Sequence, residues 1–277
     1  MEVNKHIGFR AEDEAELIEY LNKHNLRWKR GKIVSTLDIY ESNTNWPWIL
    51  EYTEKKGLFL SSEMVFSKDE LKNAQWLRLR SKWRFGYPQP ENAFGYESLT
   101  YTKDNHCDVC GVGLRQVDSF RIKKVPIWGK KSFLMLNWIG DELFLNEKAK
   151  LVLEGASISG VDFLAVKNCR GNKSLPDIYQ LVILNKMKNG LIEGQSGIDQ
   201  ISICPHCGIK KYHPTGTGML TYRKEVFENM PEIIKTAEEF GWGRGSHRNI
   251  LISQRIYQLI LEHDLAYDLV FEPLELL

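Results

Sequence analysis

The sequence predicts an α+β protein in which an N-terminal α/β region precedes a domain made of two related halves. Three observations lead to this prediction. A cysteine-free first region combines helical and strand-like patterns. A Cys-x-x-Cys-Gly motif occurs twice in the second region, 97 residues apart. Each copy of the motif is followed by a helix pattern and then by a strand pattern. We place the first region at residues 1–101 and the second domain at residues 102–277.

Composition narrows the class of protein. Apolar residues make up 43% and charged residues 26% of the 277 residues, which is typical of a soluble globular protein. The formal net charge of +1 offers no global attraction to nucleic acid or to an anionic membrane. No apolar stretch approaches the roughly 18 residues of a spanning helix, and the N-terminus lacks a signal-peptide pattern. We therefore expect a soluble, cytoplasmic protein with reduced cysteines and no membrane partner.

The first region begins with an amphipathic helix. Residues 12–25 carry apolar side chains at helical spacing after an acidic first turn. Residues 33–40 and 57–60 have strand patterns, and the Asn- and Trp-rich segment 43–48 between them is interpreted as a turn.

A helix start and a strand follow. Ser67 and Glu70 have the spacing of a capping box. Residues 76–85 alternate apolar and polar side chains, which predicts a strand. The Gly- and Pro-rich segment 86–92 is interpreted as a linker.

The second domain contains a weak internal repeat. Residues 143–149 and 250–256 are similar in character, 107 residues apart. Within them, Asn146 and Ser253 are each placed as the N-cap of a helix. The two helices lead to predicted strands at residues 161–166 and 269–274. We interpret the pattern as a duplication in which each half contributes one Cys-x-x-Cys knuckle to a shared, discontinuous zinc-ribbon-like site.

The four paired cysteines are the predicted metal ligands. Cys107, Cys110, Cys204 and Cys207 complete a four-thiolate set, which is the preferred ligand set of structural zinc. The glycine after each pair allows the backbone to fold back under the sulfurs. Residues 111–203 form a long loop between the pairs, but closure entropy grows only with the logarithm of loop length. We expect one structural Zn²⁺ per chain, and no catalytic metal because no coordination position stays open.

Three other interpretations of the cysteines are open. Iron could occupy the same knuckles, each pair could be an independent redox centre, or the thiols could pack without metal. Cys169 lies outside both motifs and is expected to be a small buried apolar side chain. His106, His206 and His213 lie near the knuckles, but we assign none of them as a ligand, and His206 is expected to point outward.

A basic strand face is the first candidate binding surface. Trp76, Arg78 and Arg80 share one face of the predicted strand and could contact a phosphate backbone or an acidic partner. The simpler interpretation is a solvated outer face above buried Leu77 and Leu79.

A Gly-rich segment near the C-terminus is the second candidate. Because residues 231–240 are interpreted as a helix, Gly241 is expected to be its C-cap rather than part of a phosphate-binding loop. The acidic pair at 238 and 239 is then solvated charge on that helix. An exposed turn presents Arg244, His247 and Arg248. No catalytic motif is present, so we expect a protein that is not an enzyme.

The two Cys-x-x-Cys-Gly motifs about a hundred residues apart, with the C-terminal Phe271-Glu272-Pro273, resemble the bacterial double-CXXCG family. Members of that family are associated with immunity to polymorphic or contact-delivered toxins. The resemblance implies a non-enzymatic immunity protein that binds and neutralises a cognate toxin domain. Candidate partner-binding residues are Trp76, Arg78, Arg80, Trp242, Arg244 and Arg248. The alternative is a zinc-ribbon nucleic-acid-binding protein, whose binding would weaken steeply with salt.

Overall fold

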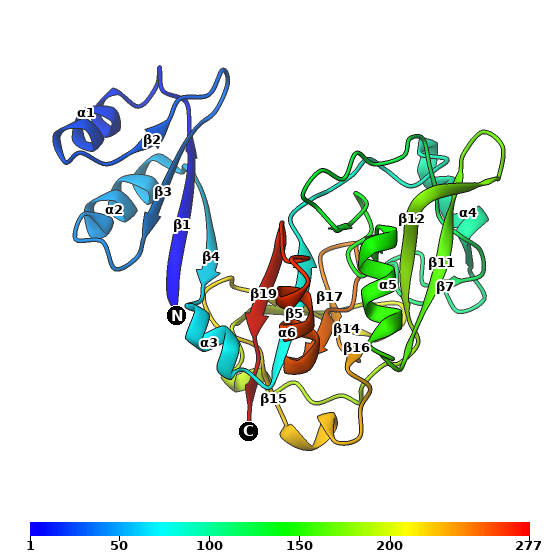
Figure 1. Ribbon diagram of the computed structural model, residues 1–277. Coiled ribbons are helices and arrows are strands. Elements are labelled where there is room, and N and C mark those ends of the chain that lie inside the picture. Colours follow the sequence, from blue (N-terminus) through cyan, green and yellow to red (C-terminus); the bar gives the residue numbers. More distant parts are fainter.

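The computed structural model describes residues 1–277 and has two lobes (Figure 1). The smaller lobe is a four-stranded antiparallel sheet, in the order β2-β3-β1-β4, with two helices. Its elements are β1 Glu2–Phe9, α1 Ala15–Lys23, β2 Trp28–Lys29, β3 Ser35–Tyr40, α2 Trp46–Lys56 and β4 Phe59–Val65.

Apolar periodicity explains most of this lobe. Helix α1 buries Leu17 and Leu21 completely, as its predicted amphipathic pattern requires. Helix α2 was missed, because the segment at its start was interpreted only as a turn. Its signals were Pro47 in the first turn and Gly57 in the left-handed conformation just past its last residue.

The larger lobe holds both cysteine motifs. Its first part contains α3 Lys68–Asn73, β5 Trp76–Ser81, α4 Tyr96–Thr100, β6 Tyr101–Thr102, β7 Arg115–Gln116, β8 Arg121–Ile122, β9 Phe133–Leu134, β10 Leu143–Leu145, α5 Glu147–Gly155, β11 Val161–Asn168 and β12 Ser174–Ile183. Its second part contains β13 Ile198–Ile203, β14 Lys210–Pro214, β15 Thr221–Tyr222, β16 Ile233–Lys235, β17 Glu239–Phe240, β18 Ile250–Ser253, α6 Gln254–Glu262, β19 Leu269–Pro273 and β20 Glu275–Leu276. The short 3₁₀ turns lie at Asn92–Phe94, Glu193–Gln195 and Lys224–Phe227.

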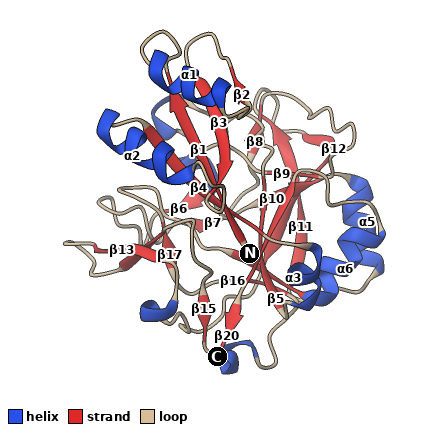
Figure 2. Ribbon diagram, turned by 90° about the vertical axis from the view of Figure 1, so that its left-hand side faces the viewer, coloured by secondary structure: helices blue, strands red, loops and turns tan.

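Two sheets of this lobe share one order of strands. The first runs β9-β10-β12-β11, with β8 parallel to β11 at its edge. The second runs β16-β18-β5-β19, and β20, which follows β19, pairs in parallel with β15. A helix leaves β10 and leads to β11 in the first sheet, and a helix leaves β18 and leads to β19 in the second. Helices α5 and α6 contribute to one hydrophobic core and lie side by side in Figure 2.

The register of the strands is also the same. In the first sheet Leu181 of the central strand lies opposite Leu143 and Phe163. In the second sheet Leu79 lies opposite Ile250 and Phe271. The same correspondence holds for the outer strands, where the pair Phe133–Leu145 matches the pair Ile233–Ile252.

The central strands do not follow chain order. Strand β5 precedes the first cysteine motif, but its partners β18 and β19 follow the second motif. Strand β12 follows the first motif and pairs with β10 and β11. The second sheet is therefore built from segments on both sides of residue 101.

Three predicted helix caps are present. The Asn146 side chain accepts a hydrogen bond of 2.9 Å from the Ala149 N–H, and Ser253 accepts one from Ile256. Ser67 and Glu70 form the complete capping box of α3. Cap residues placed these three helix starts correctly, because a cap depends only on neighbouring residues.

The prediction of a helix at residues 231–240 is wrong. The segment forms β16 and β17, and Ile233 and Ile234 are buried in two different cores on opposite sides of β16. Gly241, with φ of 111°, follows a strand and caps no helix. Non-local pairing with β18 and β14 overrides the local preference of this segment.

The acidic pair in that segment is buried rather than solvated. The Glu238 carboxylate accepts hydrogen bonds from the backbone N–H groups of Gly190, at 2.8 Å, and Leu191, at 3.1 Å. Glu239 pairs with Arg248.

None of the helices combines the length and apolar character needed to cross a bilayer.

Candidate metal centre

Both cysteine motifs form the same backbone turn. In the first, the Cys107 N–H donates to Val112 O at 2.8 Å, and the Gly111 N–H donates to Cys107 O at 2.8 Å. In the second, the Cys204 N–H donates to Ile209 O at 2.9 Å, and the Gly208 N–H donates to Cys204 O at 2.9 Å. The two glycines have φ values of 79° and 74°, a conformation in which a side chain would be strained. Each turn therefore needs its glycine.

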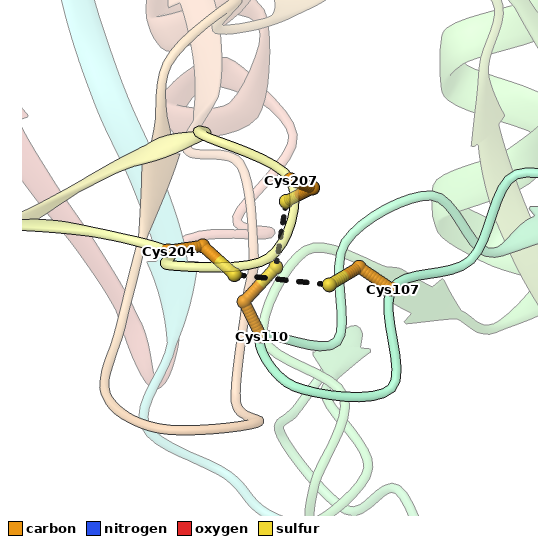
Figure 3. A group of neighbouring side chains, drawn as sticks. All are labelled: Cys107, Cys110, Cys204 and Cys207. Carbon is orange, nitrogen blue, oxygen red and sulfur yellow. Dashed lines mark hydrogen bonds between the residues drawn. The ribbon is translucent and has the colours of Figure 1, made fainter.

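Each turn lies at the end of a short hairpin. Strands β6 and β7 carry the first turn, and β13 and β14 carry the second. The two turns face each other, and all four sulfur atoms lie within 4.8 Å of one another (Figure 3). The structure thus brings together four thiols from two segments separated by residues 111–203.

Two of the sulfur–sulfur distances match those around a tetrahedral metal ion. Cys107 Sγ lies 3.7 Å from Cys204 Sγ, and Cys110 Sγ lies 3.5 Å from Cys207 Sγ. Zinc–sulfur bonds of about 2.3 Å place the sulfurs of a tetrahedron about 3.8 Å apart. Both contacts run between the turns, and both are far longer than the roughly 2.05 Å of a disulfide. The four cysteines lie close enough together to hold one metal ion.

The turns also prepare the thiols for metal binding. The backbone N–H of Cys110 lowers the pKa of Cys107 to about 6, and the backbone N–H of Cys207 lowers the pKa of Cys204. Burial instead raises the pKa of Cys110 to about 12. One sulfur of each turn is thus disposed toward the thiolate form, and Cys110 would lose its proton as the metal binds.

The Gly-rich segment 241–248 packs directly on the first turn. A Cβ atom at Gly111 would lie 1.9 Å from Arg244 O, so only glycine permits this approach. The buried Lys211 donates hydrogen bonds to Cys110 O at 3.2 Å and to Gly245 O at 3.1 Å. The same ammonium also contacts Gly243 O. The Gly-rich segment is therefore part of the framework of the metal centre.

The neighbouring histidines differ from expectation in one respect. His206 is exposed, but its ring is turned toward the first motif, with Nδ1 3.5 Å from Cys107 Sγ. The expectation that it points outward is wrong. His213 is buried and stacks on Trp242, with ring centroids 3.5 Å apart. Cys169 is half-buried and is not part of the cluster.

The basic strand face is present, but its charges are paired. Arg78 lies 3.0 Å from Glu272, and Arg80 lies 3.0 Å from Glu63 of the smaller lobe. Trp76, on the same face, packs on Phe227 with ring centroids 4.9 Å apart. This face of β5 therefore contacts other parts of the protein, including β4 of the smaller lobe, and is not simply exposed to solvent.

Three of the six candidate partner-binding residues meet in one cavity. A cavity of about 630 Å³ between the lobes is lined by Arg78, Arg80 and Trp242, which come from distant parts of the chain. His213 and Asn249 also line it, and sequence reasoning did not identify either as a site residue. Their only sequence signal is a polar residue beside an apolar strand, which is too common to single out a site.

The other candidates lie elsewhere. Arg244 is exposed at the tip of the Gly-rich segment, and Arg248 is held by Glu239. Both border a second cavity of about 620 Å³ on the other side of that segment. No protein-family model and no curated protein sequence matches this chain.

Proposed function

We propose that this protein is a non-enzymatic, zinc-containing immunity protein that binds and neutralises a cognate bacterial toxin. The observation that carries the proposal is the closed four-cysteine cluster, which ties the exposed segment bearing Trp242 and Arg244 to a rigid support. Trp and Arg side chains on a rigid support are typical of protein-binding hot spots. The resemblance of the two motifs and the C-terminal ending to the double-CXXCG family gives the biological role.

We infer that the metal is zinc. Four thiolates in a tetrahedral arrangement are the usual ligand set of structural zinc, and they leave no position for substrate or water. Rubredoxin-type iron shares this geometry, so elemental analysis of the purified protein decides between them. About one zinc per chain is expected.

We also infer that the larger lobe consists of two copies of one unit, each supplying one knuckle. The common strand order, the common register and the matched capping residues support a duplication. A duplicated unit explains why the two ligand pairs lie so far apart in the sequence.

The nucleic-acid alternative has weaker support. Its main basis was the basic face, but Glu272 and Glu63 neutralise Arg78 and Arg80 there. A phosphate backbone binds through cations that are free to replace its counterions. Measured binding to DNA or RNA that falls steeply with salt would restore this alternative.

The experiment is a protection assay. The product of a neighbouring gene, when toxic to a host cell, is expressed with and without this protein. Rescue of growth together with co-purification of the two chains is expected. A toxic neighbour that is neither bound nor neutralised would contradict the proposal.

The binding surface is tested by measuring the affinity of the same two proteins for each other. The double variant Trp242→Ala/Arg244→Ala should lose affinity for the toxin by about tenfold or more while it keeps its metal. The double variant Lys124→Gln/Arg170→Gln, which removes two exposed charges elsewhere, is the control. Equal affinities for the two double variants would exclude the Gly-rich segment from the interface.

A further inference from the structure

The two cavities lie beside equivalent strands of the two sheets of the larger lobe. Gln180 lies opposite Phe144 in the first sheet, and Arg78 lies opposite Leu251 in the second. The cavity of about 620 Å³ adjoins β12, which contains Gln180, and the cavity of about 630 Å³ adjoins β5, which contains Arg78. Both linings contain buried polar atoms without a hydrogen-bond partner, but the polar groups at the equivalent positions of the two cavities differ.

In the cavity of about 620 Å³, a buried hydrogen-bond network pairs Glu142, although His106 and Nε of Arg248 in the same lining have no hydrogen-bond partner. Glu142, just before β10, accepts hydrogen bonds from Gln180 at 3.0 Å and from Lys235 at 2.5 Å. Gln180 in turn bonds Gln116 at 2.7 Å. This buried network is complete, so it serves structure.

The cavity of about 630 Å³ has no such network at the equivalent position. Asn249 precedes β18 just as Glu142 precedes β10, and it is only 4% exposed. Its Nδ2 atom has no hydrogen-bond partner, and neither has Nδ1 of His213, which is 2% exposed. Buried polar atoms without partners are rare in proteins, so these two atoms in a cavity wall are available to bond a ligand or a water molecule.

We name the cavity of about 630 Å³ the basic cleft, because its lining has a net positive charge. Its lining contains four cationic side chains and two carboxylates. The cations are Arg78, Arg80, Lys82 and Arg84, and the carboxylates are Glu63 and Glu272.

Arg84 is the cation of the basic cleft that no carboxylate neutralises. Its Nη1 donates to Leu136 O at 3.2 Å and Ile139 O at 2.9 Å, and it forms no ion pair. These two carbonyls hold the guanidinium in place. A positioned, exposed guanidinium is suited to bind a carboxylate or another planar anion.

The walls of the basic cleft suit a peptide. Strand β4 of the smaller lobe forms one side, and Trp242, which is 62% exposed, forms part of the other. An indole beside cationic side chains offers both apolar contact and charge to an extended segment.

We propose that the basic cleft binds an acidic segment of the partner protein, with Arg84 facing its carboxylates, Lys82 shared between them and Glu63, which lies 3.3 Å from its Nζ, and Asn249 donating a hydrogen bond at the base of the cleft. This inference rests on the proposed function and names the part of the toxin that is recognised. Arg78 and Arg80 already pair with the carboxylates of Glu272 and Glu63 in this cleft, so the placement of its cations suits carboxylates.

The test uses the metal-loaded full-length chain and fluorescein-labelled hexaglutamate at low salt. Saturable binding with one peptide per chain is expected, and neutral hexaglutamine should bind at least about tenfold more weakly. The double variant Lys82→Gln/Arg84→Gln should lose about tenfold in affinity, and Asn249→Asp, which adds a negative charge, should lose as much or more. Lys124→Gln/Arg170→Gln is the matched control and should bind like wild type.

Absence of saturable binding, or equal affinity of the cleft and control variants, would overturn the inference. Hexathymidylate binding more tightly than hexaglutamate would overturn it in favour of a nucleic-acid ligand. The protection assay is read separately. A chain that protects cells but ignores hexaglutamate refutes the cleft alone, whereas failure to protect refutes the immunity function.

Discussion

Lys211, on the strand that leaves the second cysteine motif, donates a hydrogen bond of 3.2 Å to the carbonyl oxygen of Cys110 in the first motif. This hydrogen bond connects the two motifs in addition to the shared cysteine cluster. The same ammonium holds the Gly-rich segment through the carbonyls of Gly243 and Gly245. The metal centre, the second hairpin and the exposed segment therefore depend on one buried side chain.

The substitution Lys211→Met is expected to lower the free energy of unfolding by about 3 kcal/mol, because it leaves buried carbonyl groups without a donor. Lys210→Met is the matched control. Lys210 is exposed, and its pair with Glu193 at 3.1 Å lies at the surface, so its loss should cost less than about 1 kcal/mol. Urea denaturation of both variants gives the comparison, and equal midpoints would show that Lys211 has no such role.

The two motif glycines give a second matched pair. Gly111→Ala places a methyl group against Arg244 O, whereas a Cβ at Gly208 meets nothing within 4 Å. Both changes strain a left-handed residue by about 1 kcal/mol. Only Gly111→Ala should displace the Gly-rich segment, with a further loss of about 2 kcal/mol and weaker toxin binding. Thermal denaturation and the binding assay should separate the two variants.

Loss of the metal tests whether the cysteine cluster stabilises the fold by connecting the two motifs. Cys107→Ser and Cys204→Ser should each lose the bound metal and melt at a lower temperature, because the binding free energy of the metal stabilises the fold. Cys169→Ser should retain the metal and the wild-type melting temperature. Elemental analysis with calorimetry provides both readings, and metal retained in either motif variant would exclude a shared site.

The pH dependence of stability should report on His247. Burial lowers the pKa of His247 to about 4, from an ordinary value of 6.5. Between these two values the unfolded chain binds a proton that the folded His247 does not, so the free energy of unfolding falls as the pH falls. From pH 7 to pH 5 the loss attributable to His247 should be about 2 kcal/mol. His247→Gln should flatten this part of the profile, and the exposed His263→Gln should not. An unchanged slope in His247→Gln would refute the assignment.

Sequence reasoning succeeded where the signal was local. The cysteine pairs, the caps at Asn146 and Ser253, and the amphipathic pattern of α1 each depend on a few neighbouring residues. The segment containing Ile233 and Ile234 was misassigned because its conformation depends on distant partners, Ile252 and Leu251.

The basic cleft could not be found from the sequence for the same reason. Arg78, Trp242 and Asn249 have no common motif, and only the pairing of β5 with β18 brings the first and last of them to one cavity. Likewise, nothing in the pattern of β5 shows that its partners lie beyond the second cysteine motif. The number and type of elements could be predicted in part, but their connections could not.

The position of β5 has a consequence for biosynthesis. During synthesis this strand leaves the ribosome long before its partners β18 and β19 exist, since these begin at Ile250 and Leu269. Its apolar residues Leu77 and Leu79 must stay uncovered, or be held by a chaperone, until β18 and β19 have been synthesised. Folding dominated by such distant contacts is slow, and a truncated transcript would yield an aggregation-prone chain rather than a partly active one.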